Sequence, residues 1–343
     1  MALRASASYT RRARHSRRQH NTFRRRSDEV QSNAFFDGRC AGIDSLVRST
    51  GSVSLYPSKW GAADEIGSAN YLTPELVLQA SKLIKTGKVY SLGITVNTTT
   101  PAYPPRTCSI YIVQPGQTGS AEGLGPTKTT YNDDILNCWT GIGTQLDGLG
   151  HIGVGDRYYN GLKWGEFASI GGLTKLGADK VPPMVTRAVM LDMAAYFGVD
   201  VVKEGTPFNK AEIDGAMKRQ GVEIRQGDVV IFHTGWLSLI DKDPKRYGSV
   251  EPGLGREGAR YLVSKGVVAI GADTWGLEVI PFEKDAGVFE VHQILLPQSG
   301  TYILENINTA ELAKDKAYEF LFVLGQNKYQ GSVQSMINPI AIR

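Results

Sequence analysis

Residues 141–153 read GIGTQLDGLGHIG, from Gly141 to Gly153. Five of these thirteen residues are glycine, which destabilises helix and strand interiors by roughly 0.5–1 kcal/mol per residue relative to alanine. The composition therefore predicts a loop that lies against a ligand or makes unusual turns. Gln145, Asp147 and His151 offer oxygen, oxygen and nitrogen atoms at spacings of two and four residues. That mixture suits a divalent cation such as zinc or manganese.

Three histidines lie outside the arginine-rich N-terminal segment: His151, His233 and His292. A single histidine is more often structural than catalytic, but the neighbours of His151 favour a functional role. His292 precedes an apolar run and a predicted turn over 297–300, and the strand that follows closes on Glu305. A buried carboxylate without a partner is costly, so Glu305 is expected to face a polar site. For His233, a pocket wall and a hydrogen-bonded core position are equally good interpretations.

The rest of the chain alternates short apolar runs with amphipathic segments, which is typical of a mixed α/β fold. One helix is expected to begin at Pro74, with Thr73 as its N-cap, and to stop near Gly87. Further helices are expected over 210–220 and 255–265, and strands over 89–96, 109–113, 188–193, 228–233, 267–271 and 302–306. No convincing boundary divides residues 55–343, so this part is predicted to be one domain.

Charge and hydropathy exclude two classes of protein. The formal net charge is +4, but nine of the 38 basic residues are arginines that precede the first acid, Asp28. Without them, 29 basic residues face 34 acidic ones, a net of −5. A mildly acidic body argues against a nucleic-acid-binding fold. No apolar run approaches the roughly 20 residues of a spanning helix, so no membrane association is expected.

Residues 1–50 are rich in Arg, Ser and Gly, and we expect them to be a disordered extension. Their composition is compatible with an organelle transit peptide. The segment could also be a weak polyanion-binding arm, with nucleic-acid binding ranked last. A cytoplasmic protein whose extension has no function is the preferred interpretation.

The cysteines Cys40, Cys108 and Cys138 form neither a CxxC pair nor an even disulfide set, so reduced thiols are expected. Cys138 lies close enough in sequence to residues 141–153 to be a soft metal ligand. A buried structural thiol is the preferred interpretation.

Together these patterns resemble the cyclase family that includes kynurenine formamidases and isatin hydrolases. The family hallmark is H-x-G-T-H-x-D-x-x-x-H, and residues 141–151 match it at Gly143, Thr144, Asp147 and His151. A second hallmark, a histidine before a Leu-Leu-turn-Gly strand that closes on glutamate, matches residues 292–305. Further similarity lies in residues 60–74, 181–192, 233–236 and 271–274. The resemblance implies a mixed-sheet, swivelling β/β/α-type single domain over residues 55–343.

The same resemblance implies the metal ligands. The family's first two histidine ligands fall on Gly141, which has no side chain, and on Gln145, a weaker neutral donor. What remains implies one divalent ion, zinc or manganese, held by Asp147, His292 and Glu305. Gln145 or His151 is expected to complete the shell.

The activity implied is hydrolysis of a small-molecule amide, formamide or lactam C–N bond by metal-activated water. By resemblance, His151 is the general base and then the acid that protonates the leaving group. Thr144 is either a hydrogen-bond donor to the ligand or oxyanion, or a turn hydroxyl that satisfies the local backbone. Trp139, His233 and Trp275 are candidates for a substrate pocket, although such aromatic residues more often belong to the core.

Two other functions stay open at this point. The chain could be a polyketide-type cyclase or dehydratase, or a degenerate non-catalytic binding protein, which Gly141 and Gln145 would explain. A homo-oligomer, dimer or tetramer, is expected by resemblance. Arg187 is expected to make a structural ion pair rather than to bind substrate.

Overall fold

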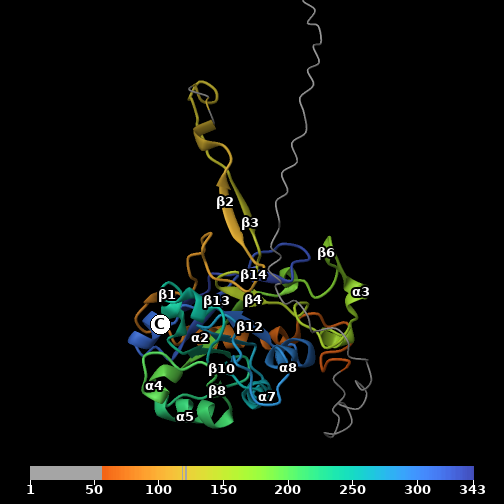
Figure 1. The fold of residues 1–343 in the computed structure, drawn as a ribbon, viewed down its shortest axis with the longest axis vertical. Coiled ribbons are helices and arrows are strands. Elements are labelled where there is room, and N and C mark those ends of the chain that lie inside the picture. Colours follow the sequence, from red (N-terminus) through yellow and green to blue (C-terminus); the bar gives the residue numbers. More distant parts are fainter. Residues whose placement is uncertain (1–55, 118, 120–121) are drawn as a thin grey trace, which may run out of the picture. The chain divides into compact units, whose positions relative to one another are not determined.

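A nine-stranded mixed sheet forms the centre of the folded part of the chain (Figure 1). The computed structural model describes residues 56–117, 119 and 122–343, so the predicted disordered extension over 1–50 lies outside the described residues. The strand order is β1-β15-β13-β7-β9-β11-β12-β4-β14. In that order the strands span Val89–Ser91, Ile340–Ile342, Glu319–Leu324, Met184–Asp192, Val229–His233, Ala269–Ala272, Tyr302–Glu305, Gln145–Asp147 and Gln334–Met336.

The central strands β7, β9, β11 and β12 are parallel, and the strands on both sides of them pair antiparallel. Parallel strands that are covered on both faces read as continuous apolar runs. The run over 229–232 in β9 is fully buried, and it is the run that predicted a strand. The predicted mixed α/β fold is confirmed.

Helices pack against this sheet, with α2 on β7 and β13, α5 on β7, and α8 on β12. Helix α2 begins where predicted, because Thr73 accepts a hydrogen bond from the backbone N–H of Leu76. The α-helices α2 to α9 span Pro74–Ser81, Trp164–Phe167, Met193–Phe197, Lys210–Gln220, Pro244–Tyr247, Arg256–Ser264, Glu290–Ser299 and Ala310–Lys314. Within the described ranges, none of the helices is long and apolar enough to cross a membrane.

Smaller elements complete the described part. Three two-stranded sheets pair β10 with β8, β2 with β3 and β5 with β6. These strands span Gly253–Leu254, Pro207–Phe208, Cys108–Ile112, Asp134–Cys138, Ala168–Ser169 and Gly172–Leu173. The 3-10 turns η1 to η5 span Gly67–Tyr71, Pro115–Gln117, Tyr159–Gly161, Ala178–Lys180 and Trp236–Leu239.

Three local predictions were wrong. The helix expected to stop near Gly87 ends at Ser81, with Lys82 as its C-cap. The strand expected over 89–96 ends at Ser91, because its partner β15 begins just after Pro339, which has no backbone N–H to donate. The turn expected over 297–300 is instead the end of helix α8, which contains Pro297 and ends at Gly300 in the left-handed region.

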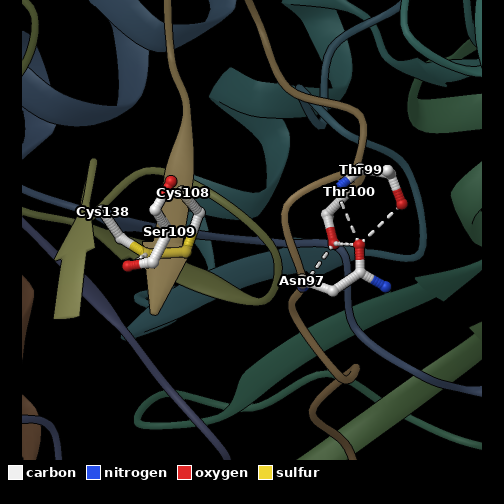
Figure 2. Close-up of a disulfide and its surroundings, with 6 residues drawn as sticks. All are labelled: Asn97, Thr99, Thr100, Cys108, Ser109 and Cys138. Atoms are coloured by element: carbon white, nitrogen blue, oxygen red, sulfur yellow. Dashed lines mark hydrogen bonds between the residues drawn. A yellow bond between two sulfur atoms is a disulfide. The ribbon is translucent and has the colours of Figure 1, made fainter. Parts of the chain in front are cut away.

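The hairpin of β2 and β3 extends away from the large sheet (Figure 1) and is closed at its base by a disulfide between Cys108 and Cys138 (Figure 2). The prediction of reduced thiols is therefore wrong for these two cysteines, and Cys40 lies outside the described residues. Strand pairing places Cys108 directly opposite Cys138, although 30 residues separate them in the sequence. Cys138 is thus not a free thiolate ligand, and the cysteines no longer support a cytoplasmic location.

Arg187 on β7 makes the predicted structural ion pair. Its Nε donates to Asp228 Oδ1 at 2.9 Å and its Nη2 donates to Asp228 Oδ2 at 2.5 Å. Nη2 also donates to the Glu223 carbonyl at 3.0 Å, and Nη1 pairs with Glu319. The Arg187 and Asp228 side chains are 10% and 4% exposed, so removing Arg187 leaves the Asp228 carboxylate buried without its counter-charge.

Replacing Arg187 with methionine is expected to lower the free energy of unfolding by about 3–5 kcal/mol, because the Asp228 carboxylate is then buried without its counter-charge. Chemical denaturation measures the loss. The control is Arg225→Met, which removes an exposed pair with Glu223 and is expected to cost less than about 1 kcal/mol. Equal losses in the two variants would show that the buried pair of Arg187 stabilises the fold no more than the exposed pair of Arg225.

Candidate metal centre

Strand β4 places two polar side chains on one face of the sheet. Gln145 and Asp147 are two residues apart, so both point to the face opposite that of the buried Leu146. Glu305 on β12 lies directly across from Gln145, and Gln334 on β14 lies directly across from Asp147. The predicted glycine-rich loop is therefore wrong at Gln145–Asp147, where glycine is absent and regular pairing is possible.

His292 reaches the same place from helix α8. Its Nε2 lies 3.4 Å from Glu305 Oε1 and 3.8 Å from Asp147 Oδ2. Asp147, His292 and Glu305 are all buried, and one ligand atom of each lies within 4.8 Å of the others. The structure thus brings together the three residues expected to hold a metal.

Two side-chain oxygen atoms of β4 lack a hydrogen-bond partner among the residues that the structure describes. Asp147 Oδ2 and Gln145 Oε1 are both buried and accept no hydrogen bond within the described part of the chain. A buried polar atom left in this state costs free energy, and native structures avoid it. A cation between Asp147, His292 and Glu305 would satisfy the Asp147 oxygen, and a mixture of carboxylate and imidazole donors suits zinc or manganese. The residues present therefore fit a divalent ion.

The amide nitrogens of Gln145 and Gln334 donate hydrogen bonds to the carboxylates of the cluster. Gln145 Nε2 donates to Glu305 Oε2 at 2.5 Å and lies 3.3 Å from Asp147 Oδ1. Gln334 Nε2 donates to the same Asp147 oxygen at 2.6 Å. One oxygen of Asp147 is thus held by amides, and the other faces the histidine and Glu305.

The cluster carries excess negative charge. Burial and the neighbouring Asp147 carboxylate raise the pKa of Glu305 to about 7. Burial lowers the pKa of His292, but its hydrogen bonds to Glu278 and Glu305 and their charges outweigh burial and raise it well above its usual value. Both raised pKa values show that the centre of the cluster would stabilise an added positive charge.

Glu278 fixes the orientation of His292. Its Oε1 lies 2.6 Å from His292 Nδ1, and its other oxygen accepts the backbone N–H of Val291 at 3.2 Å. With Nδ1 bonded to Glu278, Nε2 is the nitrogen that faces Asp147 and Glu305. A carboxylate behind a ligating histidine is a common support of metal sites.

His151 lies at the edge of the cluster. Its Nε2 is 4.0 Å from Asp147 Oδ2, and its side chain is 18% exposed, so a ligand can reach it. Burial lowers the pKa of His151; Asp147 opposes this, and His292 and Arg106 reinforce it. The net decrease keeps the imidazole neutral near pH 7, the form that accepts a proton.

Thr144 uses its hydroxyl within the fold. The hydroxyl O–H donates to the Asn306 carbonyl at 2.6 Å, and its oxygen accepts the Ile94 backbone N–H at 2.9 Å. Of its two predicted roles, this geometry matches the backbone-satisfying one, because the only hydroxyl proton is already donated.

The three pocket candidates lie in different surroundings. Trp139 is 51% exposed at the base of the hairpin. His233 lies 2.7 Å from Thr309 Oγ1 and 3.4 Å from Asp273 Oδ2, and neither partner belongs to the metal cluster. Trp275 stacks on Tyr103 at 5.8 Å, and its buried Nε1 has no partner among the described residues.

Sequence reasoning missed Glu278, Gln334 and Arg106. Glu278 lies in the apolar run 277–280, and the argument used for Glu305 would have found it. Gln334 and Arg106 had no such signal, because their importance depends on strand pairing and on a neighbouring glycine.

Glu278→Gln should weaken zinc or manganese binding by about 10-fold to 100-fold, because the shape is kept while the charge behind His292 is lost. Equilibrium dialysis of the full chain measures the affinity. The matched control is Glu290→Gln on α8, the helix that carries His292, where the carboxylate pairs with Arg256 instead. An unchanged affinity in the Glu278 variant would remove that residue from the metal centre.

A family model described as "Putative cyclase" matches residues 90–279. A solved structure described as a novel cyclase is 31% identical, with a TM-score of 0.76, and the match covers 84% of this chain and 99% of that one. No curated protein matches the chain.

Isatin hydrolases share the fold at lower identity. The enzyme from Ralstonia solanacearum is 17% identical with a TM-score of 0.58, and the match covers 79% of this chain and 98% of that one. The enzyme from Labrenzia aggregata, bound to benzyl benzoate, is 16% identical with a TM-score of 0.53, and the match covers 76% and 94%. Because the family model covers more than half of the sequence, this chain belongs to the cyclase family.

Proposed function

We propose that this protein is a metal-dependent hydrolase that cleaves the C–N bond of a small amide, formamide or lactam. The observation that carries the proposal is the buried Asp147–His292–Glu305 cluster, which has an unpartnered carboxylate oxygen and a neutral histidine at its edge. Fold neighbours include isatin hydrolases and a predicted metal-dependent hydrolase from Bacillus stearothermophilus, which supports the same class. Isatin itself is a lactam.

A divalent cation, when bound, supplies Lewis-acid chemistry that polarises a carbonyl and lowers the pKa of water from 15.7 toward about 7. The chain's own contribution is proton transfer and orientation. His151 accepts the proton of the attacking water at Nε2, and the new C–O bond forms at the carbonyl carbon. His151 then gives that proton to the nitrogen as the C–N bond breaks, so the products are a carboxylic acid and an amine. Help of this kind is worth roughly 10²-fold to 10⁴-fold in rate.

Other residues keep this arrangement in place. Glu278 sets the tautomer of His292, and Gln334 with Gln145 holds one Asp147 oxygen so that the other faces inward. Thr144 ties β4 to the chain after β12 through Asn306. These contacts hold the geometry before substrate arrives, which is how preorganised sites avoid reorganisation during reaction.

The test compares Asp147→Ala with His151→Ala. We expect Asp147→Ala to lose its metal, because it removes a ligand, and His151→Ala to keep stoichiometric metal while turnover falls by about 10²-fold to 10⁴-fold. Elemental analysis gives the metal content, and acid release from formanilides, lactams and esters with zinc or manganese supplied gives the rate. Full activity in both variants would contradict the proposed roles. Metal retained without hydrolysis of any of these compounds by the unaltered protein would favour a cyclase, dehydratase or binding role.

A further inference from the structure

The space beside Gly141 is filled by other side chains. A Cβ placed on Gly141 would lie 2.8 Å from Arg106 Nη1 and 2.7 Å from Gln334 Oε1, closer than real Cβ atoms approach. No larger residue, histidine included, fits at position 141 while Arg106 and Gln334 stay where they are. The Arg106 guanidinium therefore occupies part of the space that a histidine at position 141 would need.

Arg106 has donors to spare. Its Nη1 donates to the Gly141 carbonyl at 2.8 Å, which is the one hydrogen bond made by this side chain within the described ranges. None of the described carboxylates lies within 4.0 Å of it. A guanidinium has five N–H donors in a planar fork that matches a carboxylate. A half-buried arginine in this state can receive an anion.

This guanidinium also belongs to the surroundings of the metal centre. Gln334, which meets Arg106 at the position of the absent Cβ, donates to Asp147 Oδ1 at 2.6 Å. Arg106 is therefore one side chain away from a metal-ligating carboxylate.

An aromatic surface connects the Arg106 turn with His292. The Arg106 backbone N–H donates to the Tyr103 carbonyl at 3.1 Å, so these residues end one tight turn. Tyr103 stacks on Trp275 at 5.8 Å and meets Phe289 edge-on at 6.0 Å. The Phe289 ring in turn lies 5.2 Å from the His292 ring. An aromatic molecule can thus contact this surface while a negative group on it reaches Arg106.

We propose that Arg106 binds the carboxylate of a small aromatic acid beside the Asp147–His292–Glu305 cluster. The inference rests on the proposed function and narrows its substrates to those that carry a carboxylate. A bidentate contact fixes the acid, and the amide or lactam carbonyl then lies toward the metal ligands. The family hallmark has a histidine where this chain has Gly141. Here Arg106 occupies the space of that side chain and binds the anion.

Benzoate and nitrobenzene test this assignment, because they share a planar shape and differ in charge. Isothermal titration of the full-length, metal-loaded protein measures both. We expect Arg106→Gln to weaken benzoate binding by about 10-fold to 100-fold, the usual effect of losing a charge-assisted contact, and to leave nitrobenzene binding within about 2-fold. Arg106→Lys should restore part of the loss, since it keeps the charge without the fork.

A matched control is Arg157→Gln. Arg157 also donates to a glycine carbonyl, that of Gly161, at 2.8 Å, but it is exposed and pairs with Asp156. Its benzoate affinity should equal that of the unaltered protein. Metal content is measured in every variant and should not change. Benzoate binding that is undetectable in the unaltered protein, or equally strong after Arg106→Gln, would overturn the assignment.

The outcome is separable from that of the proposed hydrolysis, because benzoate binding requires no turnover. Arg106-dependent benzoate binding without hydrolysis of any compound tested would support the anion site and contradict the enzyme assignment. Hydrolysis of uncharged amides at full rate by Arg106→Gln, with unaltered benzoate affinity, would do the reverse.

Discussion

The structure depends on the pairing of one three-residue strand, β4, between β12 and β14. That register places Gln145, Asp147, Glu305 and Gln334 on one face of the sheet, where four polar side chains share a buried space. A shift of the register by one residue would turn Asp147 away and direct Leu146 into the cluster. The parallel strand paired with β12 is β11, which has no polar side chain and is fully buried, so we infer that the core rather than the polar residues fixes the register.

This arrangement buries a group of carboxylates away from water, which costs free energy. The raised pKa values of Glu305 and His292 and the unpartnered oxygen of Asp147 are three expressions of one imbalance. A divalent cation would remove it, and Arg106 supplies a second positive charge at the rim. The disulfide supports that rim charge, because Cys108 lies two residues after Arg106 and Cys138 lies three residues before Gly141.

Much of this could be predicted from the sequence, and the limits have physical causes. Spacing within residues 141–153 identified Asp147 and His151, and the resemblance identified His292 and Glu305. The apolar runs predicted the central strands, because parallel buried strands carry a continuous signal. The helix that carries His292 was missed because Pro297 suggested a turn.

Contacts between distant segments were not predictable in the same way. Gln334 is 187 residues from Asp147 in the sequence, and only strand pairing joins them. The Cys108–Cys138 pair and the position of Arg106 likewise depend on the β2–β3 hairpin, whose register could not be predicted from the sequence. The departure at Gly141 looked like a lost ligand, whereas the structure shows that its space is occupied.

We infer that a single cation binds between Asp147 Oδ2, His292 Nε2 and Glu305 Oε1. Anomalous diffraction from crystals of the full chain grown with manganese tests this most directly. We expect one anomalous peak per chain, within coordination distance of all three atoms. Absence of a peak there, or a peak held by other side chains, would contradict it.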